Sequence, residues 1–349
     1  MSHLLSNLPA SHLAAVETAL QQAFGTHTVT DVRLLTGGLS AASVYKIIVN
    51  GSPYVLKVDM PAASGQTERD TGAVGGQAGE HKASNQQLAA DAGVAPPLYH
   101  QDTITGISIS GLIDNKPLRS SFTPDKLTPE LARTIRAIHS IPYQAVAVDL
   151  KEIIDGLIGR FKQSRMLTGA VFNECFGHYE AVSSVYPWQD TEKVFSHNDL
   201  NPNNILSDGK RIWIIDWDVA SVNDRYVDLA NTANYFVHTQ ESEKVFLGTY
   251  FGHPPDDYQL SRLFIMRQVC RIIYSMLMLH LAAQHKPADH QHDQEMEGMD
   301  IATFSVLMGT GKLSLASYEG QLMYGKALIN EALRQMQTPR WATAMANLG

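Results

Sequence analysis

The stretch "VFSHNDLNPNNILSDGKRIWIIDWDVA", residues 194–220, decides the fold prediction. It alternates two polar bursts, "HNDLNPNN" and "DWD", with runs of Ile, Leu, Val and Trp. Apolar runs of this length are typical of buried strands, and chemistry is commonly placed where a strand ends. We therefore expect the His, Asp and Asn side chains of this stretch to lie at strand ends in a functional site.

Three residues in these bursts have the chemistry of a magnesium site. Asp199 and Asn204 lie in a segment where Pro202 and the asparagines favour a loop, and Asp216 follows the apolar run "IWII". Carboxylate and amide oxygens suit Mg²⁺, whose other ligands are waters and nucleotide phosphates. A second carboxylate near the ion can orient an acceptor hydroxyl for attack on a γ-phosphate. The pattern therefore indicates phosphoryl transfer.

Composition sets the bounds of this interpretation. The chain has 349 residues, of which 44% are hydrophobic and 18% charged, so it can form a packed interior of two lobes or domains. A formal net charge of -8 argues against a nucleic-acid partner and mildly favours a cationic or metal-complexed ligand. The two cysteines, Cys175 and Cys270, cannot form a disulfide framework and are expected to be buried thiols in the reducing cytoplasm.

No membrane partner is expected. The first twenty residues lack a basic region followed by an apolar block, so we expect no signal peptide. The apolar run at 263–283, "LFIMRQVCRIIYSMLMLHLAA", contains Arg267 and Arg271. Because such charges are costly in a bilayer, this run is predicted to be a buried core helix.

The first part of the chain is predicted to be rich in strands. Residues 44–49 and 54–58 are β-branched and aromatic, and Asn50-Gly51 between them predicts the tight turn of an antiparallel hairpin. Residues 60–79 indicate a loop, and a helix is expected from residue 80 to about 92, closed by Gly93. Beyond residue 113 helical spacing dominates, as at 128–141, where Leu131, Ile135 and Ile138 share a face.

The pattern H-x-D-x-x-x-x-N, formed by His197, Asp199 and Asn204, is followed by "IDWD" at 215–218 and "DRYVDLA" at 224–230. Together these motifs resemble the signature of the aminoglycoside phosphotransferase and choline kinase superfamily, distant relatives of the protein kinases. The resemblance implies an α+β, two-lobed, protein-kinase-like fold. It implies a small antiparallel-sheet N-lobe at 1–112, which binds the nucleotide, and a mostly helical C-lobe at 113–349, which carries the catalytic loop.

The same resemblance implies ATP and Mg²⁺ as cofactors and assigns roles to the matching residues. Asp199 would be the catalytic base and His197 a scaffold of its loop, while Asn204 and Asp216 would bind Mg²⁺. Asp218 is an acidic neighbour of the metal aspartate. Asp228 would support the catalytic loop from a helix start, a role consistent with N-capping.

In the N-lobe, the resemblance makes Lys57 of "VLKV" the partner of the α and β phosphates. The preceding segment 36–47 would cover the phosphates, with contributions from Gly37, Gly38, Ser40 and Ser43. A helix glutamate should pair with Lys57. We expect Glu80, because a carboxylate is favoured at a helix N-terminus, and Glu68 is the alternative. Residues 107–113 would form the hinge that meets the adenine ring.

The phosphate acceptor is expected to be a small-molecule alcohol. A protein substrate is disfavoured, because Asn198 stands where protein kinases have the arginine of H-R-D and no A-P-E-like segment follows Asp216. Choline/ethanolamine-like and aminoglycoside-like acceptors, both cationic, stay open, and "HNDL" favours the choline kinase side. A catalytically inactive, nucleotide-binding pseudokinase is the alternative function. Oligomeric state and ATP versus GTP preference stay open.

Each acceptor chemistry has candidate residues in the second half. An aromatic cage for a quaternary ammonium group would draw on Trp188, Trp213, Trp217, Tyr235, Phe236 and Tyr274. Carboxylates for an aminoglycoside would come from Asp293, Glu295, Glu297 and Asp300. The histidines at 280, 285, 290 and 292 lack metal-ligand spacing and indicate a polar loop.

Overall fold

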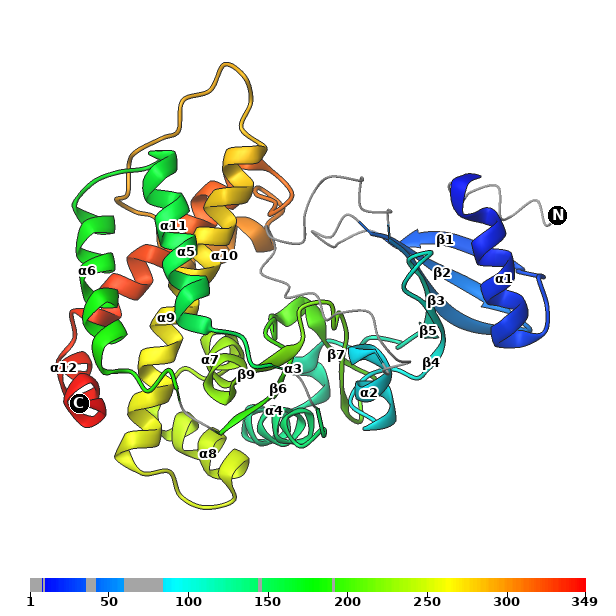
Figure 1. Ribbon diagram of the computed structural model, residues 1–349, viewed down its shortest axis with the longest axis horizontal. Helices are drawn as coiled ribbons and strands as arrows, with labels where there is room; N and C mark the ends of the chain where they lie inside the picture. The colour runs from blue at the N-terminus through cyan, green and yellow to red at the C-terminus, as the bar shows by residue number, and fades with distance from the viewer. Residues whose placement is uncertain (1–7, 9, 36–41, 60–83, 144–145, 190–191) are drawn as a thin grey trace. The chain divides into compact units, whose positions relative to one another are not determined.

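The computed structural model of the protein describes residues 8, 10–35, 42–59, 84–143, 146–189 and 192–349 (Figure 1). The chain divides into two compact units. The first consists of Met1–Ile141 with Asn201–Ala220, and the second of Pro142–Leu200 with Ser221–Gly349. The lobe boundary expected after residue 112 falls inside the first unit and stays a prediction.

The described part of the first unit contains a five-stranded antiparallel sheet. Its strands run in the order β1 (Asp31–Leu35), β2 (Ser43–Val49), β3 (Ser52–Val58), β5 (Ile107–Gly111) and β4 (Leu98–Asp102). The 3₁₀ turn Ala10–His12 leads into α1 (Leu13–Phe24), which packs against the sheet (Figure 1). Val16 and Leu20 of α1 and Ile47 and Leu56 of the sheet are fully buried in this core. Burial of one sheet face thus holds the helix in place.

The predicted hairpin is confirmed. Asn50 and Gly51, with φ of 51° and 77°, form the turn between β2 and β3, as expected for a turn that needs two left-handed residues. Side chains alternate along β3, and Leu56 and Val58 are buried in the core. Lys57 therefore points to the opposite face of the sheet.

Three α-helices, a 3₁₀ turn and a hairpin complete the described part of the first unit: α2 (Asn85–Asp91), α3 (Leu118–Ser121), α4 (Pro124–His139), the turn Pro202–Asn204, β7 (Ile205–Ser207) and β8 (Ile212–Ile214). The Ser84 side chain caps α2, and Gly93 follows the helix with φ of 70°. The predicted stop at Gly93 is therefore confirmed, while residues 80–83 lie outside the described ranges. In α4 the predicted apolar face is buried.

The second unit is mainly helical. Its strands β6 (Lys193–Ser196) and β9 (Ser221–Asp224) form an antiparallel pair. Its helices are α5 (Leu150–Ser164), α6 (Ala170–Val185), α7 (Arg225–Phe236), α8 (Gln240–Phe251), α9 (Asp257–Gln284), α10 (Ile301–Gly309), α11 (Tyr318–Met336) and α12 (Pro339–Leu348).

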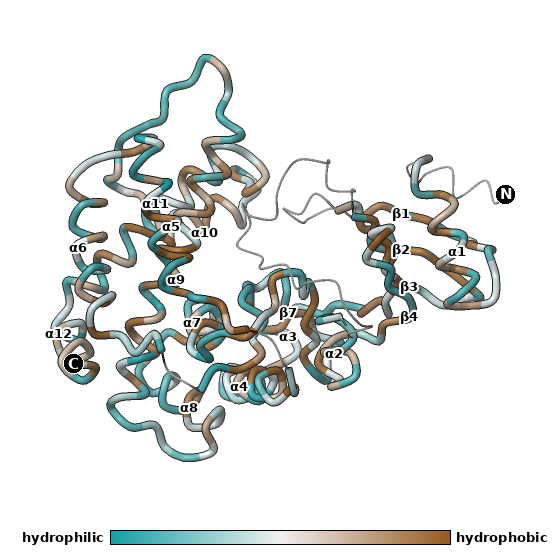
Figure 2. Tube along the Cα trace, in the orientation of Figure 1, coloured by the Kyte–Doolittle hydropathy of each residue, from teal (hydrophilic) through white to brown (hydrophobic). Residues whose placement is uncertain are grey.

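Helix α9 is the centre of this unit, and α5, α7, α8, α11 and α12 all pack against it. Its middle is hydrophobic (Figure 2). By length and composition α9 could cross a membrane, but 78% of its most apolar window is buried inside the protein. The prediction of a core helix is therefore confirmed. Cys175 and Cys270 are buried, free thiols, also as predicted.

Candidate active site

The β7–β8 hairpin brings the two predicted magnesium ligands to the same end. Ile205 pairs with Ile214, and beyond this pair the Ile215 N–H donates to the Asn204 carbonyl at 3.1 Å. Asp216 comes next, with a left-handed backbone at φ of 65°. Such a conformation is uncommon outside glycine and is often found at functional sites. The polar residues therefore do lie at strand ends, as the sequence predicts.

Lys57 lies among three carboxylates of the first unit. Its Nζ is 2.6 Å from Asp218 Oδ2, 3.6 Å from Asp216 Oδ1 and 3.7 Å from Asp59 Oδ1. Burial opposes the charged ammonium, but the attraction of Asp218, and then of Asp216 and Asp59, raises the pKa of Lys57 above its ordinary value. Lys57 is thus a cation at neutral pH.

The donor set fits a magnesium ion. Among the described residues, one ammonium faces three carboxylates and cannot neutralise them all, so this group of side chains keeps negative charge that favours a divalent cation. Within the described ranges, no group of three His, Cys, Asp or Glu side chains could hold a metal ion. An ion at Asn204 and Asp216 would therefore take its other ligands from phosphates and waters, which is the coordination that Mg²⁺ commonly has.

Part of the predicted phosphate site cannot be compared with the structure. Gly37, Gly38, Ser40, Glu80 and the alternative Glu68 lie outside the described residues. Ser43 is described and begins β2, where it pairs with Val58, next to the pair formed by Val44 and Lys57. The choice between Glu80 and Glu68 stays open, and among described residues the ionic partners of Lys57 are the three aspartates.

In the second unit, two buried side chains hold the loop that carries Asp199. The loop follows β6, and the Asp228 carboxylate accepts hydrogen bonds from the backbone N–H groups of His197, at 2.8 Å, and Asn198, at 2.7 Å. The His197 ring Nδ1 accepts the Asp199 N–H at 3.2 Å. Asp228 and His197 are fully buried. This geometry agrees with the supporting roles that the resemblance implies for both residues.

The capping role expected of Asp228 is wrong. Helix α7 begins at Arg225, directly after β9, and Asp224 caps it by accepting the Tyr226 N–H at 2.8 Å. Asp228 lies one turn further along the helix. Its carboxylate is therefore directed to the loop that carries Asp199 and not to the helix end.

The conformation and contacts of Asn198 explain why asparagine stands where protein kinases have the arginine of H-R-D. Its φ is 66°, a left-handed conformation that asparagine tolerates better than most residues. Its side-chain nitrogen donates to Ser221 Oγ at 2.9 Å, and its side-chain oxygen accepts from Asn223 Nδ2 at 2.9 Å. Both partners lie on β9, so Asn198 ties the loop to the strand beside β6.

The hydroxyl of Tyr274 donates a hydrogen bond to the Asp199 carboxylate. Burial, and then the charge of Asp199, raise the pKa of Tyr274 well above its ordinary value, so the phenol stays protonated and keeps donating. Sequence reasoning noted Tyr274 only as a cage candidate and missed this contact. A usable signal was its spacing from Arg267 and Arg271 in an apolar helix, which places three polar groups on one face.

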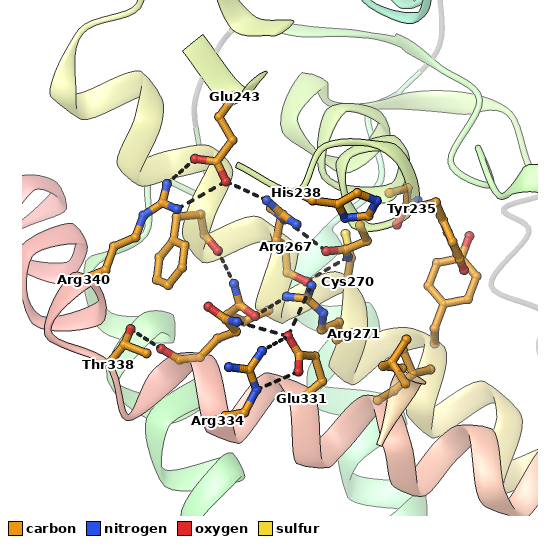
Figure 3. A pocket seen from close by; sticks show the side chains of 18 of the residues that line it. Tyr235, His238, Glu243, Arg267, Cys270, Arg271, Glu331, Arg334, Thr338 and Arg340 are labelled. Carbon is orange, nitrogen blue, oxygen red and sulfur yellow. Dashed lines mark hydrogen bonds and ion pairs between the residues drawn. The ribbon is translucent and has the colours of Figure 1, made fainter. Parts of the chain in front are cut away.

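A cavity of about 920 Å³ lies in the second unit, and Tyr274 and Tyr235 are among its lining residues. Figure 3 shows Tyr235 at this cavity. Of the carboxylate candidates, Asp300 also lines the cavity. Trp217 is buried in the first unit, and Asp300 caps α10. Asp293 forms an ion pair with Lys326 at 3.3 Å. The structure therefore brings two of the aromatic candidates to the cavity but does not gather either predicted set as a whole.

A small antiparallel sheet that carries a partly buried lysine, and a loop of His, Asp and Asn followed by a strand-end aspartate, define the class of protein-kinase-like phosphotransferases. The profile of the Phosphotransferase enzyme family matches residues 31–258, well over half of the sequence, and the chain belongs to this family. The resemblance seen in the motifs is thereby confirmed.

Solved structures share the fold. The choline/ethanolamine kinase family protein from Mesorhizobium loti is 19% identical, with a TM-score of 0.64 over 96% of this chain and 99% of that chain. A spectinomycin phosphotransferase in complex with ADP and spectinomycin is 14% identical, with a TM-score of 0.58 over 93% of this chain and 98% of that chain. The predicted α+β, kinase-like fold is therefore confirmed.

A curated relative is similar over a shorter region. The "Protein LicA homolog" of Mycoplasma capricolum is 32% identical over 69 residues, which is 20% of this chain and 29% of that protein. The chain spans less than a third of the length of the curated relatives that it matches.

Proposed function

We propose that the protein is an ATP-dependent phosphotransferase that moves the γ-phosphate to a hydroxyl group of a small molecule. One observation carries the proposal: the hairpin that sets Asn204 beside Asp216 also places Asp216 3.6 Å from the Lys57 ammonium. A phosphate-binding cation and hard-oxygen metal ligands thus lie within one unit. Membership of the Phosphotransferase enzyme family and the ADP complex of a structural neighbour support it.

The residues of the first unit would hold the nucleotide. Lys57 would bind the α and β phosphates in place of part of its pairing with Asp218, since both partners are anions. Asn204 and Asp216 would hold Mg²⁺, which, when bound, neutralises charge on the phosphate oxygens. The role of these side chains is positioning, which supplies much of the catalysis in phosphoryl transfer.

Asp199 would act on the acceptor. As the acceptor oxygen forms its bond to the γ-phosphorus, the bond from that phosphorus to the bridging oxygen of ADP breaks, and the hydroxyl proton passes to the Asp199 carboxylate. Tyr274 would orient that carboxylate through its hydrogen bond. The products are ADP and the phosphorylated acceptor, and Asp199 then returns the proton to solvent.

The pseudokinase alternative has no support in the site. Asp199, Asn204, Asp216 and Lys57 are all present, and a protein that only binds nucleotide has no chemical need of Asp199. The structural neighbours, a choline/ethanolamine kinase family protein and a spectinomycin phosphotransferase, keep choline-like, ethanolamine-like and aminoglycoside-like alcohols as starting candidates.

The test is release of ADP from Mg·ATP with choline, ethanolamine, aminoglycosides, homoserine, thiamine and methylthioribose. We expect ADP that depends on one acceptor and is lost in the Asp199→Asn variant, while ATP binding, measured by calorimetry, stays close to that of the wild type. Equal turnover in Asp199→Asn would refute the role of the base. ATP binding without transfer to any acceptor would favour the pseudokinase.

A further inference from the structure

Three polar side chains on α9 form one face of the cavity. Arg267, Arg271 and Tyr274 follow each other at the i, i+4 and i+7 positions of the helix, and all three line the cavity of about 920 Å³. Figure 3 shows the two arginines at this cavity. Tyr274 is the residue whose hydroxyl contacts Asp199. The two arginines and Tyr274, which contacts the proposed base Asp199, therefore line the same side of the cavity.

The carboxylates that line the cavity are already engaged. Glu243 is shared by Arg267 Nη1 at 2.6 Å and Arg340 Nη2 at 2.5 Å (Figure 3). Glu331 pairs with Arg334 at 2.7 Å. The third lining carboxylate, Asp300, accepts the Thr303 N–H and caps α10.

Arg271 is the least compensated of the four lining arginines. In the part of the chain that the structure describes, its closest carboxylate oxygen is Oε1 of Glu331, at 3.9 Å, and its hydrogen bond goes to the neutral amide of Gln268. Its side chain is only 9% exposed. Burial, and then the charge of Arg267, lower the pKa of Arg271 to about 10, so it is still a cation at neutral pH.

Among the described lining residues, four arginines thus stand against three carboxylates, and the surplus cation is buried. A buried charge without a full partner is costly unless an anion compensates it. We infer that the cavity binds an anionic group, a carboxylate or a phosphate, of the acceptor alcohol, with Arg271 as its main contact. The inference rests on the proposed function, because it assumes that the acceptor hydroxyl lies at Asp199.

The geometry of the helix limits the size of this acceptor. At a rise of 1.5 Å per residue, Arg271 lies about 4.5 Å along the axis from Tyr274, and Arg267 about 10 Å. The hydroxyl and the anionic group would therefore belong to one small molecule. A quaternary ammonium group at the same place would be repelled by Arg271. The local charge of the cavity therefore disfavours a cationic acceptor, whereas the net charge of -8 mildly favours one.

A charge series on one carbon skeleton tests the inference. Glycerol, 3-amino-1,2-propanediol, D-glycerate and glycerol 3-phosphate would be compared as acceptors by ADP release. Their binding would be measured by calorimetry with Mg²⁺ and a non-hydrolysable ATP analogue. We expect the two anions to react or bind at least about tenfold better than the neutral and cationic members, since charge-assisted hydrogen bonds have that strength.

Variants locate the effect at Arg271. Arg271→Gln should raise the KM or Kd of the anions about tenfold or more and leave those of glycerol unchanged, while Arg271→Lys should keep part of the preference. Arg133→Gln removes an exposed arginine that pairs with Glu130 on α4, and it should change nothing. Because Arg271 is buried, circular dichroism would first show that each variant is folded.

The outcomes distinguish failure of the anion inference from failure of the proposed phosphotransferase function. If the cationic member is preferred, if neither anion binds the wild type, or if folded Arg271→Gln binds the anions normally, the anion inference fails while phosphotransfer can stand. If the anions bind through Arg271 but no alcohol of either panel releases ADP, the proposed function fails and the anion site stands.

Discussion

The phenol of Tyr274 on α9 donates its hydrogen bond to the carboxylate of Asp199, in the loop after β6. The loop backbone is held separately, by Asp228 and by the ring of His197. Backbone and carboxylate are thus positioned from two different helices. Since α9 also carries Arg267 and Arg271, one helix contacts the proposed base and lines the cavity.

Replacing Tyr274 by Phe should lower kcat about tenfold and leave the KM for ATP unchanged. The change removes one hydrogen bond to a charged group, of roughly 1.5–3 kcal/mol, and keeps the ring. Tyr186→Phe is the matched control, because it removes a 2.7 Å hydrogen bond to Asp224 elsewhere in the same unit. The control should lower thermal stability without a change in kcat. An unaltered kcat in Tyr274→Phe would refute the proposal that Tyr274 positions the Asp199 carboxylate.

Lys57→Met should raise the KM for ATP about tenfold or more, because a charge-assisted contact to phosphate is lost. Lys46→Met, opposite Val55 on the neighbouring strand, is the control and should keep the wild-type KM. If both variants bind ATP like the wild type, Lys57 is not a phosphate ligand.

Lys57 also gives a prediction for pH. Its pKa is raised by the surrounding aspartates above the ordinary 10.5. Its contribution to the free energy of unfolding is therefore complete below that value and is lost as pH rises through the folded-state pKa. Urea unfolding of the wild type and Lys57→Met should show a constant difference from pH 7 to about 10 and a smaller one above 10.5. A difference that grows with pH would contradict the assignment.

Asp216→Asn should reduce the gain in nucleotide affinity that Mg²⁺ provides, by about tenfold or more, because a carboxylate ligand becomes an amide. Asparagine tolerates the left-handed backbone at this position, so the hairpin should stay folded. Asp208→Asn, in the turn of the same hairpin, is the control. Titration of ATP with and without Mg²⁺ measures the effect, and an identical Mg²⁺ response in Asp216→Asn would exclude it as a ligand.

Two substitutions of Asn198 distinguish the cost of its left-handed backbone from the loss of its side-chain hydrogen bonds. Both Asn198→Ala and Asn198→Gly lose the hydrogen bonds to Ser221 and Asn223. Alanine must in addition adopt φ of 66°, so Asn198→Ala should be less stable than Asn198→Gly by about 1 kcal/mol in urea unfolding. Equal stability of the two variants would mean that the loop relaxes out of this conformation.

Local signals in the sequence predicted much of the fold. The Asn50-Gly51 turn, the buried face of α4 and the core position of α9 each depend on short-range periodicity or turn chemistry, which one sequence contains. The loop residues Asp199 and Asn204 were found because a motif fixes their spacing.

Contacts between distant segments could not be predicted in this way. The cap of α7 is Asp224 and not Asp228, because the end of β9 determines where the helix starts. The bonds of Tyr274 to Asp199 and of Arg340 to Glu243 join residues 75 and 97 positions apart. Only packing in three dimensions establishes such pairs, and net charge gave no indication of the arginines gathered around one cavity.

The register of the β7–β8 hairpin has a consequence for how the gene can vary. Asn204 and Asp216 are neighbours only because Ile205 faces Ile214 across the two strands. Deleting one codon inside either strand would shift this register and turn the side chains of that strand to the other face. Insertions are better tolerated at the turn, where Asp208 and Gly209 lie, because they leave the register intact. Length variation in this region should therefore concentrate between residues 208 and 211.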